Sequence, residues 1–321
     1  MIYFYAYNFK TCSTNLISLF LIFDTWYQFN LGVDIFGLKQ HSPTRLTGPF
    51  SGPHIGMWLT KLIIIPIFLF TIIKNYKNFL KNKYSSLAFF IFFLIFFFTI
   101  FITGERMALL MSILSIFTIL LGLILSKNMS IWKVVPFLFF LYFAIYFFSI
   151  IDPKQAERAI YSTIQKITNW SNSDYGMIWK NAFDVWMESP WFGAGLHKYR
   201  EACQILVYGS IENVKTPGLC FHPHNVSMQL LSETGIVGFI LFFTMVISLS
   251  IRLLKDSFRK KHWLLFFLIL NVLIACFLPI QSNTDFFSNK YSSLVWLLVG
   301  VSLGLCRYIE NKKNLPNSHQ P

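Results

Sequence analysis

The sequence predicts an all-α protein that crosses a membrane about eight times and carries one large extracytoplasmic loop between spans five and six. Hydrophobic residues make up 55% of its 321 residues and charged residues only 13%. Soluble domains carry about 25% charged residues, so this composition excludes an ordinary soluble domain. The apolar residues also form runs of about 17–25 residues, the length of a helix that spans a bilayer.

Each apolar run defines one predicted span. The spans are residues 14–31, 57–74, 86–103, 107–126, 131–151, 226–251, 263–280 and 291–307. The first is the weakest, because Asp24, Gln28 and Asn30 interrupt it, and an interfacial or re-entrant segment is the alternative. Residues 1–11 lack the pattern of a cleavable signal peptide.

The spans divide the chain into four parts. These are N-terminal transmembrane helices at 1–151, an extracytoplasmic loop at 152–223, C-terminal transmembrane helices at 224–313 and a disordered tail at 314–321. Connecting loops as long as 152–223 usually carry secondary structure or function of their own. We therefore expect structure in this loop rather than a plain connector.

Basic residues between the spans indicate the orientation. They cluster at Lys74, Lys77, Lys81 and Lys83, at Arg252, Lys255, Arg259, Lys260 and Lys261, and at Arg307, Lys312 and Lys313. These clusters fall on one side if eight spans alternate, and the positive-inside rule makes that side cytoplasmic. The net charge of +13 then reflects membrane orientation and does not indicate a nucleic-acid partner.

The large loop contains a helical segment followed by a turn. Trp179, Phe183 and Trp186 recur on one face of residues 179–187, which predicts an interfacial helix lying on membrane lipids. Pro190 ends this segment, and two glycines follow in a turn at 191–195. The loop also holds Cys203 and Cys220. An oxidising compartment would permit a disulfide between them, and two unpaired apolar side chains are the alternative.

The segment 222–238 concentrates polar chemistry where an apolar helix begins. Asn225, Gln229, Ser232 and Glu233 recur at helical spacing, so they predict a polar stripe on an apolar helix. Polar groups in a bilayer are costly and usually face a site or a cavity. Two glycines, Gly235 and Gly238, follow on the apolar side, where we expect close contact between helices.

Histidine and arginine side chains supply the candidate chemistry. His224 is suited to general-base catalysis near neutral pH, and a structural histidine is the alternative. Arg106 lies between two predicted spans. It either binds a phosphate, with Glu105 orienting the guanidinium, or reaches the lipid head groups. Arg200 follows the turn at 193–195, where glycine N–H groups and basic side chains can hold a phosphate, although a solvated basic turn is the alternative. Arg45 is either a further anion contact or a simple loop charge.

Several reaction classes lack their motifs in this sequence. The two histidines at 222 and 224 have no cysteine or carboxylate at zinc-like spacing, so we predict no metal site. Neither a phosphate-binding loop nor a dinucleotide fingerprint is present, and no cofactor is expected. A cytoplasmic nucleotide substrate is therefore disfavoured.

The sequence resembles the O-antigen ligase family of bacterial inner-membrane glycan transferases. The resemblance rests on His224-Asn225, nine residues and then Gly235-x-x-Gly238. It is supported by Glu233, by Pro190-x-x-Gly193-x-Gly195, by Thr103-Gly104-Glu105-Arg106 and by Arg45-x-x-Gly48, and it covers about residues 40–240.

The chain departs from the family pattern at several points. Members usually have more spans, and many have Ser where Glu105 stands. They also have an arginine shortly before the tryptophan that corresponds to Trp179. Here Arg158 or Arg200 would have to supply that charge.

The resemblance implies an enzyme that uses a polyprenyl-diphosphate-linked glycan as donor. Arg106 and Arg200 would bind the diphosphate, His224 would activate the acceptor hydroxyl, and Arg45, Asn225, Gln229 and Glu233 would contact substrate. The expected product is a glycan joined to a lipopolysaccharide core or a similar acceptor on the periplasmic face of the inner membrane.

Two alternatives remain at this stage. One is an O-antigen or exopolysaccharide polymerase, whose acceptor is a growing polysaccharide. The other is a non-enzymatic protein, either a lipid-linked glycan transporter or a structural partner of an export complex. Few charges lie within the predicted spans, and this disfavours a transporter.

Overall fold

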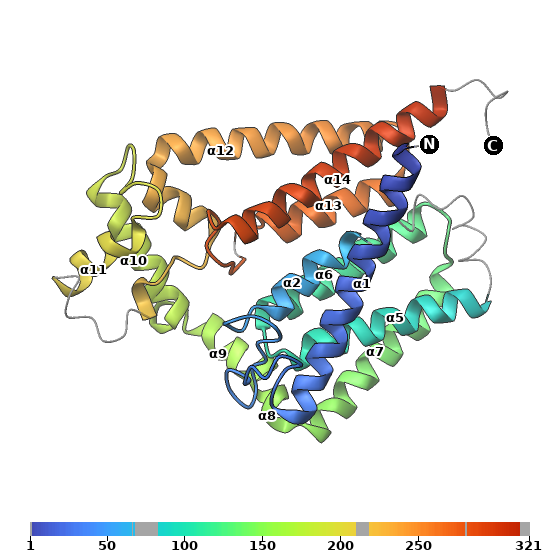
Figure 1. Cartoon of the computed structure of the whole chain (residues 1–321), viewed down its shortest axis with the longest axis horizontal. Helices are drawn as coiled ribbons and strands as arrows, with labels where there is room; N and C mark the ends of the chain where they lie inside the picture. Colours follow the sequence, from blue (N-terminus) through green and yellow to red (C-terminus); the bar gives the residue numbers. More distant parts are fainter. Residues whose placement is uncertain (1, 66, 68–82, 210–217, 280, 315–321) are drawn as a thin grey trace. The chain divides into compact units, whose positions relative to one another are not determined.

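The computed structural model describes residues 2–65, 67, 83–209, 218–279 and 281–314, and these are mostly helical (Figure 1). Among the described residues no strand is formed; only the isolated bridges Val33–Lys39 and Ser42–Arg45 occur. The prediction of a helical protein is therefore confirmed. Residues 315–321 of the predicted tail lie outside the described residues, and the last helix ends at Asn314.

The chain forms two compact units, each described below by itself. Unit 1 comprises Met1–Thr163, Leu253–Cys276 and Leu298–Pro321, and unit 2 comprises Ile164–Arg252 and Phe277–Leu297. Three C-terminal helices contribute residues to both units. They are α12 (Val226–Arg259), α13 (Trp263–Phe277) and α14 (Asn289–Asn314).

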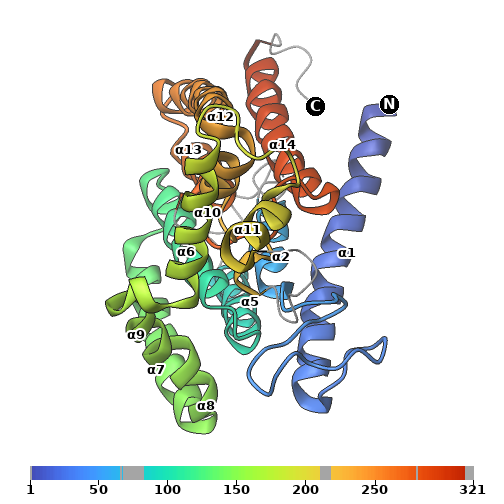
Figure 2. The ribbon, with the colours of Figure 1, turned by 90° about the vertical axis from the view of Figure 1, so that its left-hand side faces the viewer.

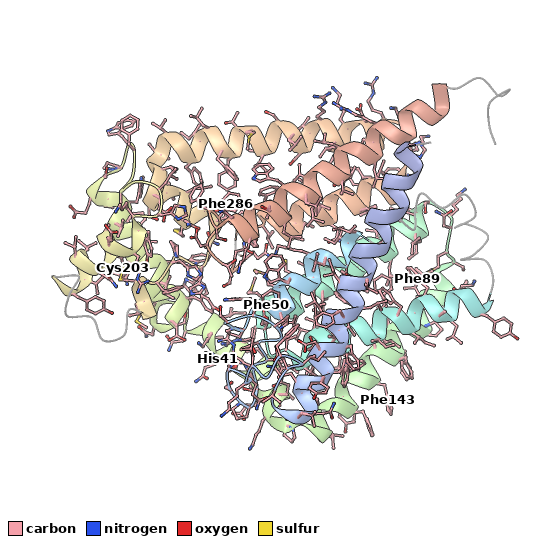
Figure 3. All side chains as sticks on the ribbon, in the orientation of Figure 1. His41, Phe50, Phe89, Phe143, Cys203 and Phe286 are labelled. Atoms are coloured by element: carbon pink, nitrogen blue, oxygen red, sulfur yellow. A yellow bond between two sulfur atoms is a disulfide. The ribbon has the colours of Figure 1, made fainter. Side chains whose placement is uncertain are left out.

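Unit 1 is built mainly from apolar helices. They are α1 (Ile2–Leu31), α2 (Ile55–Leu62), α5 (Lys83–Ile102), α6 (Arg106–Leu125), α7 (Ile131–Ile151) and α8 (Pro153–Ala156), and they lead into the π-helical turn η1 (Glu157–Tyr161) and α9 (Ser162–Thr168). Helix α1 packs against α2 and α5 and crosses them at an angle (Figure 1 and Figure 2). Phenylalanines recur along α5, and within this helix Phe89 lies 4.8 Å from Phe93 between ring centroids (Figure 3).

Two of the described helices are long and apolar enough to cross a membrane, namely α6 and α12. Shorter apolar helices cover Ser86–Ile102, Ile131–Phe147 and Trp263–Phe277. The predicted range 57–74 begins in α2, but residues 66 and 68–82 lie outside the described residues. Exposed aromatic side chains along α7, such as Trp132 and Phe139, suit a lipid environment better than water.

Unit 2 contains the folded part of the large loop. Helix α10 (Asp174–Glu188) covers the predicted helical segment, and its N-cap Ser173 accepts a hydrogen bond from Gly176 N at 3.1 Å. Helix α11 (Tyr199–Tyr208) follows, and it ends at Gly209 in the left-handed conformation. Both helices pack with the short 3₁₀ turn η3 (Gly218–Cys220).

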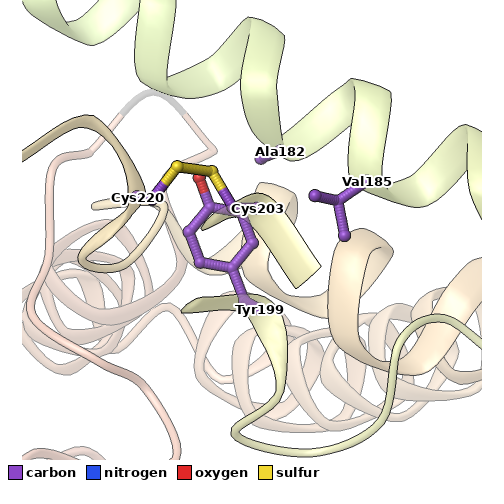
Figure 4. Packing of buried hydrophobic residues seen from close by; sticks show 5 residues of the cluster. All are labelled: Ala182, Val185, Tyr199, Cys203 and Cys220. Carbon is purple, nitrogen blue, oxygen red and sulfur yellow. A yellow bond between two sulfur atoms is a disulfide. The ribbon is translucent and has the colours of Figure 1, made fainter. Parts of the chain in front are cut away.

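A disulfide holds the core of this loop. Cys203 of α11 is bonded to Cys220 of η3, which decides between the two alternatives left open by the sequence. The bond is fully buried with Tyr199, against Ala182 and Val185 of α10 (Figure 4). It therefore fixes the chain two residues before His222.

Candidate functional site

The first turn of α12 is fixed by Asn225. Its Oδ1 accepts a hydrogen bond from Met228 N at 3.1 Å, the geometry of an N-cap. Its Nδ2 donates to the carbonyl oxygens of Pro279 and Gln281. The buried amide thereby joins the start of α12 to the segment after α13, so its hydrogen bonds serve to position the backbone.

His224 lies directly before this cap. Its backbone is in the left-handed region at φ 54°, and its carbonyl oxygen accepts a hydrogen bond from Asn283 N at 2.7 Å. Its ring lies against His222, at 3.7 Å between centroids, and 6.0 Å from the ring of Tyr175 on α10. The imidazole is partly exposed, whereas His222 is buried. Of the two histidines, His224 is thus the one that a substrate reaches more easily.

Arg200 occupies a neighbouring position on α11. Its guanidinium lies over the ring of Phe221, 5.1 Å from the centroid, and the side chain is exposed. Phe221 is adjacent in sequence to His222, and the disulfide brings both close to α11. The contact leaves guanidinium N–H groups for an anion, because a cation–π contact uses the face of the guanidinium plane.

Helix α12 is broken at Gly235, and the turn after α10 repairs the break. Gly235 has φ 65° and ψ −171°, so the helix bonds from Ile236 and Val237 back to Ser232 and Glu233 are lost. The turn replaces all of them. Ile236 N and Val237 N donate to the carbonyl oxygens of Pro190 and Trp191, while Ala194 N and Gly195 N donate to those of Ser232 and Glu233, at 2.8–3.3 Å.

The backbones approach so closely here that only glycine fits. A Cβ on Gly193 would lie 2.5 Å from the carbonyl carbon of Glu233, and one on Gly235 would lie 2.3 Å from the carbonyl oxygen of Trp191. This reciprocal contact joins the two glycine motifs of the sequence. The prediction of a helix–helix contact at Gly235 is therefore wrong, because this glycine packs against the turn at 191–195.

A hydrogen-bonded network follows the polar stripe of α12. Gln229 Nε2 donates to Asp285 Oδ1 at 2.5 Å and to Glu233 Oε2 at 3.4 Å, while Gln229 Oε1 accepts from Phe286 N at 2.8 Å. Glu233 Oε2 also accepts from His197 N at 3.2 Å. The stripe predicted from spacing alone thus serves as one side of a larger constellation.

In unit 1, Glu105 has a different role from the one the sequence suggested. We expected it to orient Arg106. Its carboxylate instead accepts hydrogen bonds from Gly56 N at 2.6 Å and Met57 N at 3.1 Å, in the first turn of α2. Burial raises the pKa of Glu105 to about 7, against the lowering effects of these N–H groups, Arg45 and Lys61.

The turn at 103–106 brings several arginines together. Arg158 Nε donates to Gly104 O at 3.1 Å, and Arg106 Nη1 contacts Ser162 O at 3.5 Å. Gly104, at φ 69°, approaches Thr44 so closely that a Cβ would lie 1.8 Å from its carbonyl oxygen. The loop that carries Arg45 therefore packs on this turn, and Arg45 Nε is buried without a hydrogen-bond partner.

Two histidines missed by the sequence lie in the same cluster. The pKa of His41, an exposed residue, is lowered by partial desolvation and by the nearby charges of Arg45 and Arg158. The pKa of His54 is lowered by burial and then by Arg45 and His41. Neighbouring positive charge that disfavours a protonated imidazole equally favours a bound anion.

The predicted site residues thus fall into two sets. Unit 2 holds His224, Asn225, Gln229, Glu233 and Arg200, and unit 1 holds Arg45 and Arg106. Sequence reasoning missed Tyr175, His197 and Asp285 in unit 2. The proximity of His197 to the glycine turn was the one available signal, since Asp285 is 56 residues from its partner Gln229.

The chain was compared with protein families and with curated proteins. A family model described as O-Antigen ligase matches residues 90–243, which include the turn at 103–106, the loop helices and the first half of α12. No curated protein matches the chain. The matched residues carry the His224-Asn225 motif, both members of the glycine contact and Arg106. This match supports the assignment of the chain to the O-antigen ligase family.

Proposed function

We propose that this protein transfers a glycan from a polyprenyl-diphosphate carrier to an acceptor hydroxyl, as an O-antigen ligase on the outer face of the inner membrane. The observation that carries the proposal is the start of α12. There Asn225 and the hydrogen bond from Asn283 N to the carbonyl oxygen of His224 fix a partly exposed His224 at the end of a largely apolar helix. Polar side chains at such a position in a membrane helix are typical of a reaction site.

The proposed reaction needs one base and one cation. His224 takes the proton of the acceptor hydroxyl while that oxygen attacks the anomeric carbon of the donor sugar. The bond from this carbon to the phosphate oxygen breaks, and the polyprenyl diphosphate leaves with the electron pair. Arg200, in the same unit as His224, stabilises its negative charge, so the proposal requires neither a metal nor a cofactor. Arg45 and Arg106 are proposed separately as anion contacts of unit 1.

The acceptor assigned here is a lipopolysaccharide core or a similar glycolipid. Gln229 and Glu233 are buried and hydrogen-bonded to one another, so we assign them to positioning the groups that contact the acceptor, and Asn225 holds the backbone beside them. A polymerase would use the same site with a growing polysaccharide as acceptor. The identity of the accumulated glycan in a deletion strain separates the two enzymes.

We also propose eight membrane spans, with residues 152–223 in the periplasm. Support comes from the positions of the basic clusters and from the Cys203–Cys220 disulfide, which suits an oxidising compartment. Replacing both cysteines by serine and introducing Ser171→Cys gives the test, since Ser171 is exposed. Labelling of residue 171 by an impermeant thiol reagent in intact spheroplasts is expected, and labelling only after lysis would invert the topology.

The main test of function is His224→Ala in a strain lacking the chromosomal gene. Loss of a general base typically slows a reaction by roughly 10²–10⁴-fold. We expect free carrier-linked glycan to accumulate and ligated glycan to disappear, with normal amounts of membrane-inserted protein. His222→Ala is the matched control and is expected to be milder. Normal ligation by His224→Ala would remove this histidine from the mechanism.

A further inference from the structure

An imidazole and a carboxylate lie side by side at the accessible end of the α12 network. His197 Nδ1 is 3.5 Å from Asp285 Oδ2, and their side chains are 59% and 35% exposed. Neither residue is part of the motifs that define the family resemblance. Both belong to unit 2, and both remain reachable by a dissolved or lipid-bound molecule.

The network fixes one side of each group and leaves the other side open. Asp285 Oδ1 accepts hydrogen bonds from Gln229 Nε2 at 2.5 Å and from Phe287 N at 3.0 Å, so Oδ2 is the oxygen that faces His197. His197 is held through its backbone, whose N–H donates to Glu233. Its φ of 60° is a strained value for a non-glycine residue, and such strain often marks a functional position.

Charge decides which part of the substrate suits this pair. Glu233 and Asp285 are both within hydrogen-bonding reach of Gln229, so two carboxylates share one amide. A phosphate group placed beside them would be repelled at this distance. A neutral hydroxyl can instead donate to Asp285 Oδ2 and accept from a ring N–H of His197.

An aromatic ring completes the arrangement. The ring of Phe287 lies 6.1 Å from that of His197, at an interplanar angle of 71°. Phe287 is partly exposed and adjacent in sequence to the buried Phe286. Carboxylate and imidazole groups beside an apolar ring match the two kinds of surface on a sugar, its hydroxyl edge and its C–H face.

We propose that His197 and Asp285, with Phe287, bind a neutral sugar residue of the acceptor through its hydroxyl groups. This inference rests on the proposed function and names the part of the acceptor that unit 2 recognises. The pair acts in binding, and His224 remains the residue that takes the proton. The two roles separate in kinetics, because loss of a binding contact raises KM whereas loss of the base lowers kcat.

Two conservative substitutions test the pair. Asp285→Asn keeps an oxygen for Gln229 and Phe287 N but removes the charge at Oδ2. His197→Asn removes the imidazole and tolerates the left-handed backbone. Lys290→Ala is the matched control, because this exposed residue lies nearby in sequence without a place in the pair. The acceptor is the detergent-extracted glycolipid fraction of a strain lacking the gene, varied at a fixed, saturating amount of donor.

We expect each substitution to raise the KM for the acceptor about tenfold while kcat changes less than threefold, since a hydrogen bond to a charged group has an effect of this size. A second measurement is independent of turnover. Saturation-transfer NMR of the oligosaccharide released from that fraction, with His224→Ala protein, should show contact that His197→Asn removes. An unchanged KM in both variants, or an equal effect of Lys290→Ala, would overturn the subsite. Absence of transfer by the wild-type protein, with NMR contact retained, would instead overturn the proposed function alone.

Discussion

The glycine turns of the two units hold their charged side chains by different means. In unit 2, Gly193 and Gly235 are locked by backbone hydrogen bonds that replace the broken bonds of α12. In unit 1, Gly104 also packs against the backbone of another segment, at Thr44, but here side chains hold the surrounding turn in place. Glu105 caps α2, and Arg158 donates to Gly104 O.

This difference has consequences for sensitivity to pH and charge. Backbone amides do not titrate, so the lock in unit 2 keeps its geometry across the physiological pH range. The turn in unit 1 depends on a carboxylate whose pKa is shifted to about 7 and on guanidinium groups. Substitutions that add side-chain volume should therefore destabilise unit 2 most. Changes of charge or of pH should mainly affect unit 1.

The largest expected effect comes from filling the backbone contact of unit 2. Gly235→Ala and Gly193→Ala each place a Cβ within 2.6 Å of fixed backbone atoms, so the turn and helix must separate. We expect almost no folded protein in fluorescence-detected gel filtration. Gly209→Ala is the control, since Gly209 has φ 72° but nothing within 4 Å, and only left-handed strain of ~1–2 kcal/mol applies. Equal behaviour of the three variants would show that the contact has no structural importance.

A smaller effect is expected from exchanging one cation for another in unit 1. Arg106→Lys keeps the charge but loses the forked donor geometry, so we expect about tenfold weaker binding of a polyprenyl diphosphate. Affinity is measured for purified protein in lipid nanodiscs. Lys154→Ala removes an exposed charge of α8 in the same unit and should leave the affinity unchanged. If Arg106→Ala binds as tightly as the wild type, Arg106 has no part in diphosphate recognition.

The last prediction concerns the stability of the protein as a function of pH, and it isolates Glu105. The Glu105 carboxylate binds a proton more tightly in the folded chain than in the unfolded chain, where its pKa is near 4.5. Raising the pH from about 4.5 to 7 therefore lowers the free energy of unfolding, by up to roughly 3 kcal/mol. Above pH 7 this contribution is constant, and below pH 4.5 the stabilisation is fully present.

Glu105→Gln should remove this dependence. Melting temperatures of both proteins in detergent, at several values between pH 5 and 8, provide the comparison. His41 and His54 titrate in the opposite sense, because their lowered pKa values favour the folded state as pH rises. The difference between the melting temperatures of the wild type and the variant at each pH cancels the contribution of these histidines. Parallel curves for the two proteins would mean that the Glu105 pKa is not raised.

Local patterns in the sequence were sufficient for the helices and for the polar stripe. Apolar runs, Pro190 and helical spacing predicted α10 and the start of α12, because these depend on neighbours within a few residues. The spacing of Gln229 and Glu233 also predicted correctly that they share a face, and they are hydrogen-bonded in the structure. The glycine motifs were recognisable as motifs, although their mutual contact was not.

The sequence by itself predicted a helical membrane protein, a resemblance to the O-antigen ligase family, and His224 beside a polar stripe. Only the tertiary structure decided which groups complete that stripe. Asp285 joins Gln229 across 56 residues, His197 joins Glu233 across 36, and Glu105 caps a helix 49 residues away. Such partners leave no periodic trace in the sequence, because a hydrogen bond across a fold depends on where whole elements pack and not on the spacing of residues along the chain.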